Sequence, residues 1–166
     1  QHLSQAIQVR TVSYPDPSQI DPAEFLRFHQ LLESSYPLVH ANLSREIVAG
    51  YSLLYTWKSE PEKKLPLLLM GHMDVVPVQP GSEGAWSRPP FDGEIAQGYV
   101  WGRGAMDNKV GVLGILEAVE KLLADGYKPT RTVYLAFGHD EELGGPAGAS
   151  HIAELLRARG VRLEFV

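Results

Sequence analysis

The stretch LLLMGHMDVVPV, residues Leu67–Val78, combines a nearly all-apolar run with two polar residues at its end. The apolar run is bounded by Pro66 and Gly71, which is typical of a strand that is covered on both faces. His72 and Asp74 follow, and because they are two positions apart, their side chains point the same way in an extended segment. The stretch therefore predicts a buried strand that brings a histidine and a carboxylate to one edge of a sheet.

Helix and strand patterns alternate on both sides of this stretch. Before it we predict a helix that begins at Asp21 (DPAEFLRFHQLLESSYP) and a hairpin that turns at Ala49-Gly50. After it we predict a hairpin turning at Gln97-Gly98, a helix from Asp107 to about Asp125 with Gly126 as its C-cap, a buried strand in RTVYLAF, a helix that stops at Gly160, and a strand that begins in VRLEFV. The alternation predicts an α/β fold with a mixed, largely parallel sheet flanked by helices.

Composition narrows the possible functions. At 166 residues the chain is long enough for one folding unit with a sizeable core. The net charge of −5 and the absence of a basic cluster argue against a nucleic-acid partner. No apolar run is long enough to span a bilayer, so we expect a soluble protein. The sequence contains no cysteine, so any metal must be held by His, Asp or Glu.

Three acidic or histidine groups stand out along the chain. They are His72 with Asp74, then Asp107, then Asp140-Glu141-Glu142. The first and third follow the two most strongly apolar strands, and the second opens a helix. Because ligands of open α/β sheets bind outside the carboxyl ends of the strands, we expect these groups to converge.

Each group also has an ordinary structural explanation. His72 and Asp74 are consistent with a hydrogen-bonded polar pair at a strand end, and Asp107 with a helix N-cap. Glu141 and Glu142 suit the positive end of the next helix dipole. However, two adjacent acids beside a buried strand repel each other unless a cation compensates or one is protonated. The doublet therefore favours a pair of cations bridged by a carboxylate, with histidine indicating zinc.

Three segments also carry a resemblance to a known family: GHMDVVPV, WSRPPFDGEIAQGYVWGRGAMDNK and GHDEELGGPAGA. They resemble the zinc-dependent peptidase and amidohydrolase family that includes carboxypeptidase S, glutamate carboxypeptidase, aminoacylase and succinyl-diaminopimelate desuccinylase. The segments TVSYPD, YSLLYTW and RTVYLAFGHDEELGG are most similar to the carboxypeptidase S and N-fatty-acyl amino acid hydrolase branch. The likeness runs from about Leu3 to the last residue.

The resemblance implies a role for each candidate residue. His72 would bind one zinc, Asp74 would orient His72, Asp107 would bridge two metals, Glu141 would be the general base, and Glu142 would bind the second metal. It also implies a cis peptide bond between Asp107 and Asn108. Two Zn²⁺ ions would fill a complete site, with Co²⁺ or Mn²⁺ as substitutes.

The resemblance further implies a hydrolase that cleaves the bond joining an acyl or aminoacyl group to a free amino acid. Its substrate would be a small N-acyl amino acid or peptide. Relatives also need a further carboxylate ligand, a late histidine and an inserted lid or dimerisation domain, none of which is found here. We therefore expect residues 1–166 to be the N-terminal portion of one catalytic domain that is inactive alone, with any homodimer formed through the missing domain.

Two other functions stay open. The missing ligands favour a non-catalytic metal-binding or interaction fragment, which should hold zinc weakly. A phosphodiesterase would also need bridging carboxylates, although the adjacent base disfavours it. Arg103 and Lys109 flank Asp107, where support of the site and ordinary solvation are equally compatible with the sequence. No signal-peptide pattern opens the chain, which leaves open both a cytoplasmic location and export followed by removal of an N-terminal segment.

Overall fold

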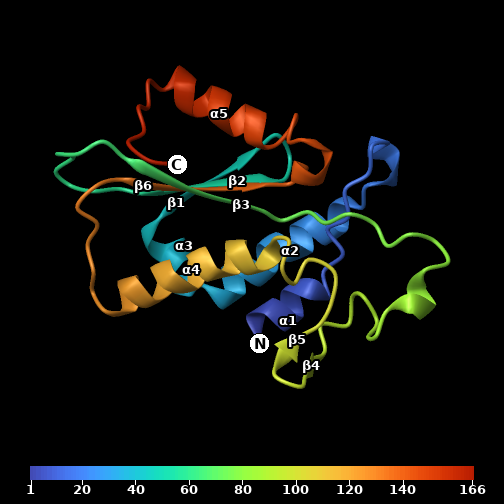
Figure 1. Cartoon of the computed structure of the whole chain (residues 1–166). Coiled ribbons are helices and arrows are strands. Elements are labelled where there is room, and N and C mark those ends of the chain that lie inside the picture. Colours follow the sequence, from blue (N-terminus) through green and yellow to red (C-terminus); the bar gives the residue numbers. More distant parts are fainter.

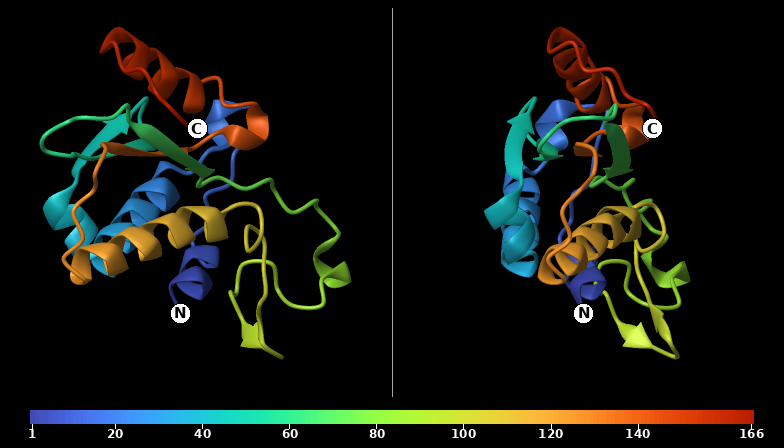
Figure 2. Two further views of the ribbon diagram at one scale, coloured as in Figure 1. Left: turned by 60° about the vertical axis from the view of Figure 1, so that its left-hand side comes forward. Right: turned by 90° about the vertical axis from the view of Figure 1, so that its left-hand side faces the viewer.

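The computed structural model describes residues 1–166, and its main, mixed β-sheet lies between two unequal layers of helices (Figure 1). The strands are β1 (Ser44–Val48), β2 (Ser52–Trp57), β3 (Leu67–His72), β4 (Ile95–Ala96), β5 (Tyr99–Val100) and β6 (Val133–Gly138). The helices are α1 (His2–Ile7), α2 (Pro22–Ser35), α3 (Pro37–Asn42), α4 (Lys109–Ala124) and α5 (Ala149–Ala158). α5 covers one face of the sheet, and α1 to α4 lie on the other (Figure 2).

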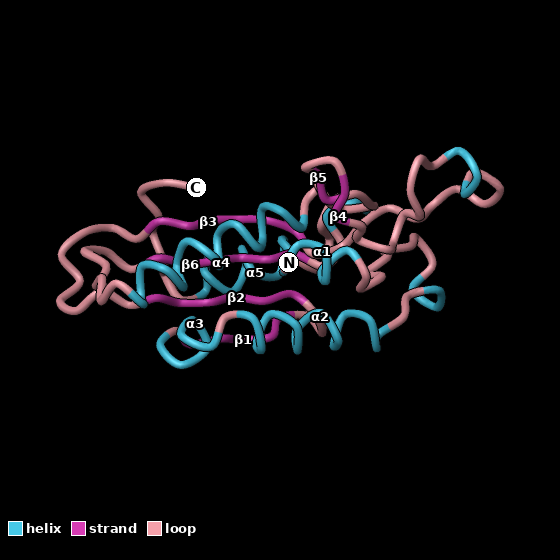
Figure 3. Tube along the Cα trace, turned by 90° about the horizontal axis from the view of Figure 1, so that it is seen from below, coloured by secondary structure: helices cyan, strands magenta, loops and turns pink.

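The main sheet has the strand order β1-β2-β6-β3. Viewed through the helices, the strands run side by side in this order (Figure 3). β1 pairs with β2 and β2 with β6 in antiparallel fashion, whereas β3 and β6 are parallel. The sheet is mixed and flanked by helices, as predicted. Its parallel part is smaller than predicted, because it is limited to the pairing of β3 with β6.

Both predicted hairpins form, and their turns explain why. Ala49 and Gly50 adopt φ values of 50° and 92° between β1 and β2. Gln97 and Gly98 adopt φ values of 56° and 81° between β4 and β5. Two successive residues with positive φ give a turn whose twist matches that of the flanking strands. A glycine in the second position lowers the cost of this conformation.

The core follows from the alternation of side chains along the central strands. In β2, Leu53, Tyr55 and Trp57 belong to the large core cluster, which also contains residues of α1 to α4. Leu54 points to the other face, where it joins a smaller cluster with residues of α5. Because both faces of β2 are covered, its apolar residues are nearly continuous in sequence.

β3 differs from the prediction that it is covered on both faces. It is one of the two edge strands of the sheet, and its burial is incomplete. Leu69 and Met70 are 40% and 51% exposed, although Leu68 is buried against the α5 side of the sheet. An edge strand lies at the margin of the helix layers, so the helices leave some of its side chains uncovered.

Three predicted elements differ from the structure in where they begin or how far they extend. α4 begins at Lys109 rather than Asp107, and its N-cap is Asn108. α5 begins at Ala149, after a turn rich in glycine, and Gly160 follows its end with a φ of 69°. The segment VRLEFV forms no extended strand. Its pairing is limited to a bridge between Leu67 and Phe165.

The chain between β3 and α4 projects beyond the carboxyl end of β3 and carries the small β4–β5 hairpin (Figure 2). It returns to the main body at Asp107, beside the end of β3. None of the helices combines the length and the apolar character needed to cross a membrane.

Candidate metal centre

The parallel pairing of β3 and β6 brings the polar groups together. His72, the last residue of β3, pairs with Gly138, the last residue of β6. The amide of Met73 then donates to the carbonyl of Gly138 at 2.8 Å, which extends the pairing by one step. The residues that follow the two strands therefore leave the sheet at the same edge, as the sequence predicts.

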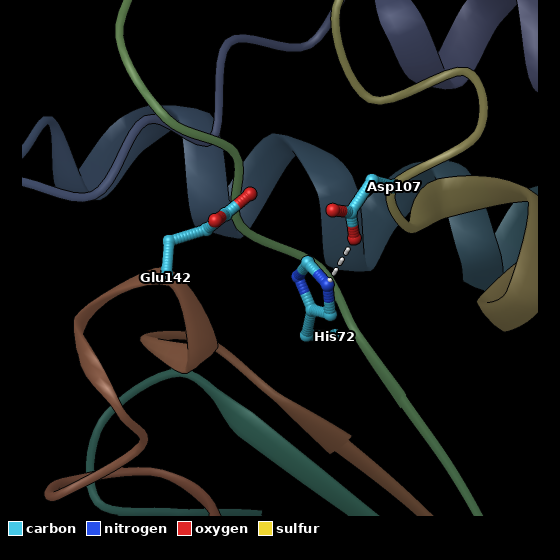
Figure 4. A group of neighbouring side chains, drawn as sticks. All are labelled: His72, Asp107 and Glu142. Atoms are coloured by element: carbon cyan, nitrogen blue, oxygen red, sulfur yellow. Dashed lines mark hydrogen bonds and ion pairs between the residues drawn. The ribbon is translucent and has the colours of Figure 1, made fainter.

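His72, Asp107 and Glu142 form a cluster in which one ligand atom of each residue lies within 4.8 Å of the others. His72 comes from β3, Asp107 from the loop before α4, and Glu142 from the 3₁₀ helix Glu141–Leu143 (Figure 4). Nε2 of His72 lies 2.9 Å from Oδ1 of Asp107. Three segments that are distant in sequence thus supply one imidazole and two carboxylates.

The other ring nitrogen of His72 faces Asp74. Nδ1 lies 3.0 Å from the backbone oxygen of Asp74 and 3.3 Å from its Oδ1. Burial opposes the charged ring, but the hydrogen bonds with Asp74 and Asp107 outweigh it and raise the pKa of His72 to about 9. With its Nδ1 side occupied, the ring presents Nε2 to the cluster, which is how a metal-ligating histidine is usually oriented.

Asp74 is fully buried, and its carboxylate gathers donors from three parts of the chain. Oδ2 accepts the hydroxyl of Ser13 at 2.8 Å and the amide of Glu142 at 3.2 Å, and Oδ1 accepts the amide of Glu141 at 3.1 Å. Burial raises the pKa of Asp74, but the hydrogen bonds from His72, Ser13 and Glu142 prevail and lower it. Asp74 therefore holds both the imidazole and the acidic doublet in place.

Glu141 and Glu142 are adjacent in sequence but lie in different surroundings. Burial, and then the negative charge of Asp107, raise the pKa of Glu142. Glu141 is 59% exposed, and its Oε2 lies 3.6 Å from Nε2 of His72. The doublet therefore has one carboxylate in the cluster and one at its open side, within reach of the same imidazole.

Asp107 does not serve as a helix N-cap. Asn108 has that position, and its side chain accepts the amide of Gly111 at 3.2 Å. The side chain of Asp107 is instead directed to His72 and is 78% exposed. The peptide bond between Asp107 and Asn108 is cis, as the resemblance implies.

The structure also gives roles to residues that the sequence left without one. Asp140 turns away from the cluster, since its carboxylate accepts the amides of Ala147 and Gly148 at 2.7 and 2.8 Å. Lys109 is fully buried and has no carboxylate partner. Its Nζ donates to the carbonyls of Ala6 and Val9, and burial lowers the pKa of Lys109 to about 7. The sequence signal for Lys109 was only its place two residues after Asp107.

The donor set fits a zinc ion. Histidine nitrogen and carboxylate oxygen are both ordinary zinc ligands. The three negative side chains of Asp107, Glu141 and Glu142 are close enough that a cation would relieve their repulsion. The exposed side chains of Asp107 and Glu141 leave the cluster open to solvent on one side.

Comparison with known proteins identifies the family of this chain. The sequence profile of Peptidase family M20/M25/M40 matches residues 68–166, the part of the chain that contains all five candidate residues. The chain belongs to this peptidase family. One relative is "Probable carboxypeptidase S-like 2" of Dictyostelium discoideum, to which the chain is 48% identical over 154 residues. The alignment covers 92% of the chain and 29% of that relative.

A second M20 relative comes from the acyl amino acid branch. The chain is 40% identical over 166 residues to "N-fatty-acyl-amino acid synthase/hydrolase PM20D1" of Xenopus tropicalis, covering 99% of the chain and 32% of the relative. The chain therefore spans about a third of the length of these relatives. The fold is also that of a solved M20 metallo-carboxypeptidase from Sulfolobus solfataricus, with a TM-score of 0.73 at 20% identity over 99% of the chain and 35% of that structure.

Proposed function

We propose that this chain carries the first part of the active site of a zinc-dependent M20 hydrolase. The substrate would be a small N-acyl amino acid or peptide, cleaved at the amide bond to a free amino acid. The observation that carries the proposal is the cluster of His72, Asp107 and Glu142, with Asp74 behind the imidazole. The names of the carboxypeptidase and acyl amino acid relatives support this class of substrate.

Residues His72, Asp107 and Glu142 would hold zinc, with Asp107 shared between two ions in a complete site. Co²⁺ or Mn²⁺ would be expected to substitute. Zinc supplies two effects when bound, since it makes a water more acidic and polarises a carbonyl oxygen. Asp74 would keep His72 in the orientation in which Nε2 faces the ligands.

Glu141 would be the general base. Its carboxylate is exposed beside the cluster, and its backbone amide is fixed by Asp74, so the side chain starts from a defined position. It would accept a proton from the attacking water as the water oxygen bonds to the amide carbon. When the C–N bond breaks, the same proton would pass to the leaving amine nitrogen. The exposure of Glu141 suits a group that must reach a substrate.

We further infer that residues 1–166 form the N-terminal portion of a single catalytic domain. Two features support this inference. The chain spans about a third of its relatives, and three ligands are fewer than a two-metal site requires. Any lid or dimerisation domain would then lie outside these residues, and the 166-residue chain alone would be inactive.

Glu141→Gln in the full-length protein tests the proposal. It should lower the turnover of an N-acyl amino acid or dipeptide by about 10²- to 10⁴-fold, the usual contribution of a general base. Zinc content, measured by elemental analysis, should stay unchanged. The matched control is Glu154→Gln, because Glu154 is an exposed acid on α5 and should not affect turnover.

Two results would count against the proposal. Full turnover by Glu141→Gln would remove the base assignment. A full-length parent protein that binds zinc but cleaves neither substrate would support the non-catalytic alternative instead.

A further inference from the structure

The N-terminal segment Ala6–Ser13, which we call the brace, contacts the candidate metal centre without contributing a ligand. It pairs with the chain that follows β3. The amide of Val75 donates to Thr11 O at 3.0 Å, and the amide of Ser13 donates to Val75 O at 3.2 Å. The hydroxyl of Thr11 also donates to Met73 O at 2.6 Å. The brace is therefore fixed beside the segment that carries His72 and Asp74.

The other end of the brace is joined to the second ligand-bearing segment. Nζ of Lys109 donates to the carbonyl of Ala6 at 2.8 Å and to that of Val9. The same ammonium lies 5.1 Å from the centre of the Phe28 ring. Because Lys109 is two residues after Asp107, these bonds fix the backbone from which Asp107 reaches His72.

The third link runs through Ser13, which is 2% exposed. Its hydroxyl donates to Oδ2 of Asp74 at 2.8 Å. Apart from His72, Ser13 supplies the side-chain donor to this carboxylate, and the other donors are the backbone amides of Glu141 and Glu142. A carboxylate held at Oδ2 keeps its Oδ1 directed to Nδ1 of His72.

We propose that the brace positions the metal centre, and that Ser13 is a positioning residue that acts through Asp74 on His72, Glu141 and Glu142. The inference rests on the proposed function, because its purpose is to hold zinc ligands. Removal of the hydroxyl leaves Oδ2 short of a donor and loosens the carboxylate. Groups that bond a metal ligand directly, as Asp74 bonds His72, commonly contribute about 10- to 100-fold to metal affinity, and Ser13 acts on that group.

The test compares Ser13→Ala, Ser13→Thr and Ser4→Ala. Ser13→Thr retains the hydroxyl. Ser4→Ala is the matched control, since Ser4 on α1 donates to Gly93 O and does not contact Asp74. Zinc affinity is measured by competition with a chromophoric chelator, and the visible spectrum of the Co²⁺-loaded protein reports ligand geometry.

Ser13→Ala should bind Zn²⁺ about 10-fold more weakly than the parent, the lower end of the range for a direct partner of a ligand, and should alter the Co²⁺ spectrum. Ser13→Thr should restore both properties, and Ser4→Ala should change neither. A purely structural role would lower the melting temperature of Ser13→Ala and Ser4→Ala alike without a spectral change. Parent-like zinc affinity and an unchanged spectrum in Ser13→Ala would overturn the proposal.

Hydrogen exchange of the metal-free proteins separates this proposal from the proposed function. If Asp74 is loosened, the amides of Glu141 and Glu142 should exchange faster in Ser13→Ala than in the parent or in Ser4→Ala. If the parent binds no zinc, the zinc hydrolase proposal fails, and this exchange still decides the positioning role. Unchanged exchange at both amides would overturn it.

Discussion

Oδ1 of Asp74 lies 3.3 Å from Nδ1 of His72, on the opposite side of the ring from Asp107. The imidazole is therefore held between a buried carboxylate and an exposed one. The buried carboxylate is also the acceptor for the two amides that begin the 3₁₀ helix Glu141–Leu143. One side chain thus connects the orientation of the histidine to the position of the acidic doublet.

Asp74→Asn should disturb both connections. An asparagine has one acceptor oxygen, so its NH₂ group would face the backbone amide of either Glu141 or Glu142, which can only donate. We expect a loss of about 1–3 kcal/mol in the free energy of unfolding, because a buried donor is left unpaired. Zinc affinity should fall by about 10- to 100-fold. Chemical denaturation and zinc competition measure the two effects.

Asp125→Asn is the control for this substitution. Asp125 follows α4 and pairs with Lys121 at 3.0 Å on the surface. Exposed pairs of this kind contribute about 0–1 kcal/mol, and no effect on zinc is expected. Equal losses of stability and zinc affinity in both variants would refute the central role of Asp74.

Some parts of the fold and of the site can be predicted from the sequence, because they depend on residues that are close together in the chain. The two-residue turns at Ala49-Gly50 and Gln97-Gly98 need positive φ values, which glycine-containing pairs supply. His72 and Glu142 converge because apolar strands precede them and those strands are parallel neighbours. The apolar strands of the sequence are therefore enough to predict that His72 and Glu142 meet at one edge of the sheet, whereas Asp107 reaches them from a loop.

Other parts depend on contacts between distant positions. Ser13 and Asp74 are 61 residues apart, and Lys109 and Ala6 are 103 residues apart. A serine before a proline-containing turn, or a lysine near a helix start, has no local feature that specifies such a partner. VRLEFV has the composition of a strand, yet pairing needs a register that composition does not specify. For the same reason, the sequence does not predict that β3 lies at an edge of the sheet.

Substitution of Glu142 should test its role as a zinc ligand separately from the role of Glu141 as a base. Glu142→Gln removes a carboxylate from the cluster, so zinc affinity should fall roughly tenfold or more. The fold should be retained, because the side chain of Glu142 makes no hydrogen bond that stabilises the sheet. Glu154→Gln on α5 is the matched control. Zinc binding by Glu142→Gln at the parent affinity would exclude Glu142 as a ligand.

A pair of glycine substitutions tests the loop that carries the doublet. A Cβ at Gly148 would lie 2.5 Å from Oδ1 of Asp140 and 2.7 Å from Oγ of Ser52, both of which are buried. Gly148→Ala should therefore cost about 1–3 kcal/mol of stability through overpacking. A Cβ at Gly114, in the middle of α4, would instead point into open space, with no atom of another element within 4 Å.

Gly114→Ala should accordingly stabilise the protein by about 0.5–1 kcal/mol, because alanine loses less backbone entropy in a helix. Thermal unfolding of the two variants against the parent gives both values. A stable Gly148→Ala variant would contradict the packing described around Asp140 and Gly148, and destabilisation by Gly114→Ala would contradict the open space described at Gly114.

His29 gives the stability of the fold a dependence on pH. It is buried on α2, and its Nε2 lies 2.8 Å from the backbone oxygen of Tyr51. Burial lowers the pKa of His29, and the positive charges of Arg45 and of His139, when protonated, act in the same direction. The hydrogen bond to Tyr51 opposes the shift but does not cancel it.

A lowered pKa in the folded state means that the unfolded chain takes up the proton first. As the pH falls below the ordinary histidine value of about 6.5, the unfolded state gains stability relative to the folded state. The titration of His29 should therefore lower the melting temperature as the pH falls from about 7.5 to about 5.5, whereas His72, whose pKa is raised, acts in the opposite direction. His29→Gln retains an N–H donor for Tyr51 and cannot titrate, so its melting temperature should fall less over this range. Histidines that do not interact with His29, including His72, contribute equally to both proteins and cancel in the difference. Parallel melting curves of the parent and His29→Gln across this range would show that His29 titrates as it does in the unfolded chain.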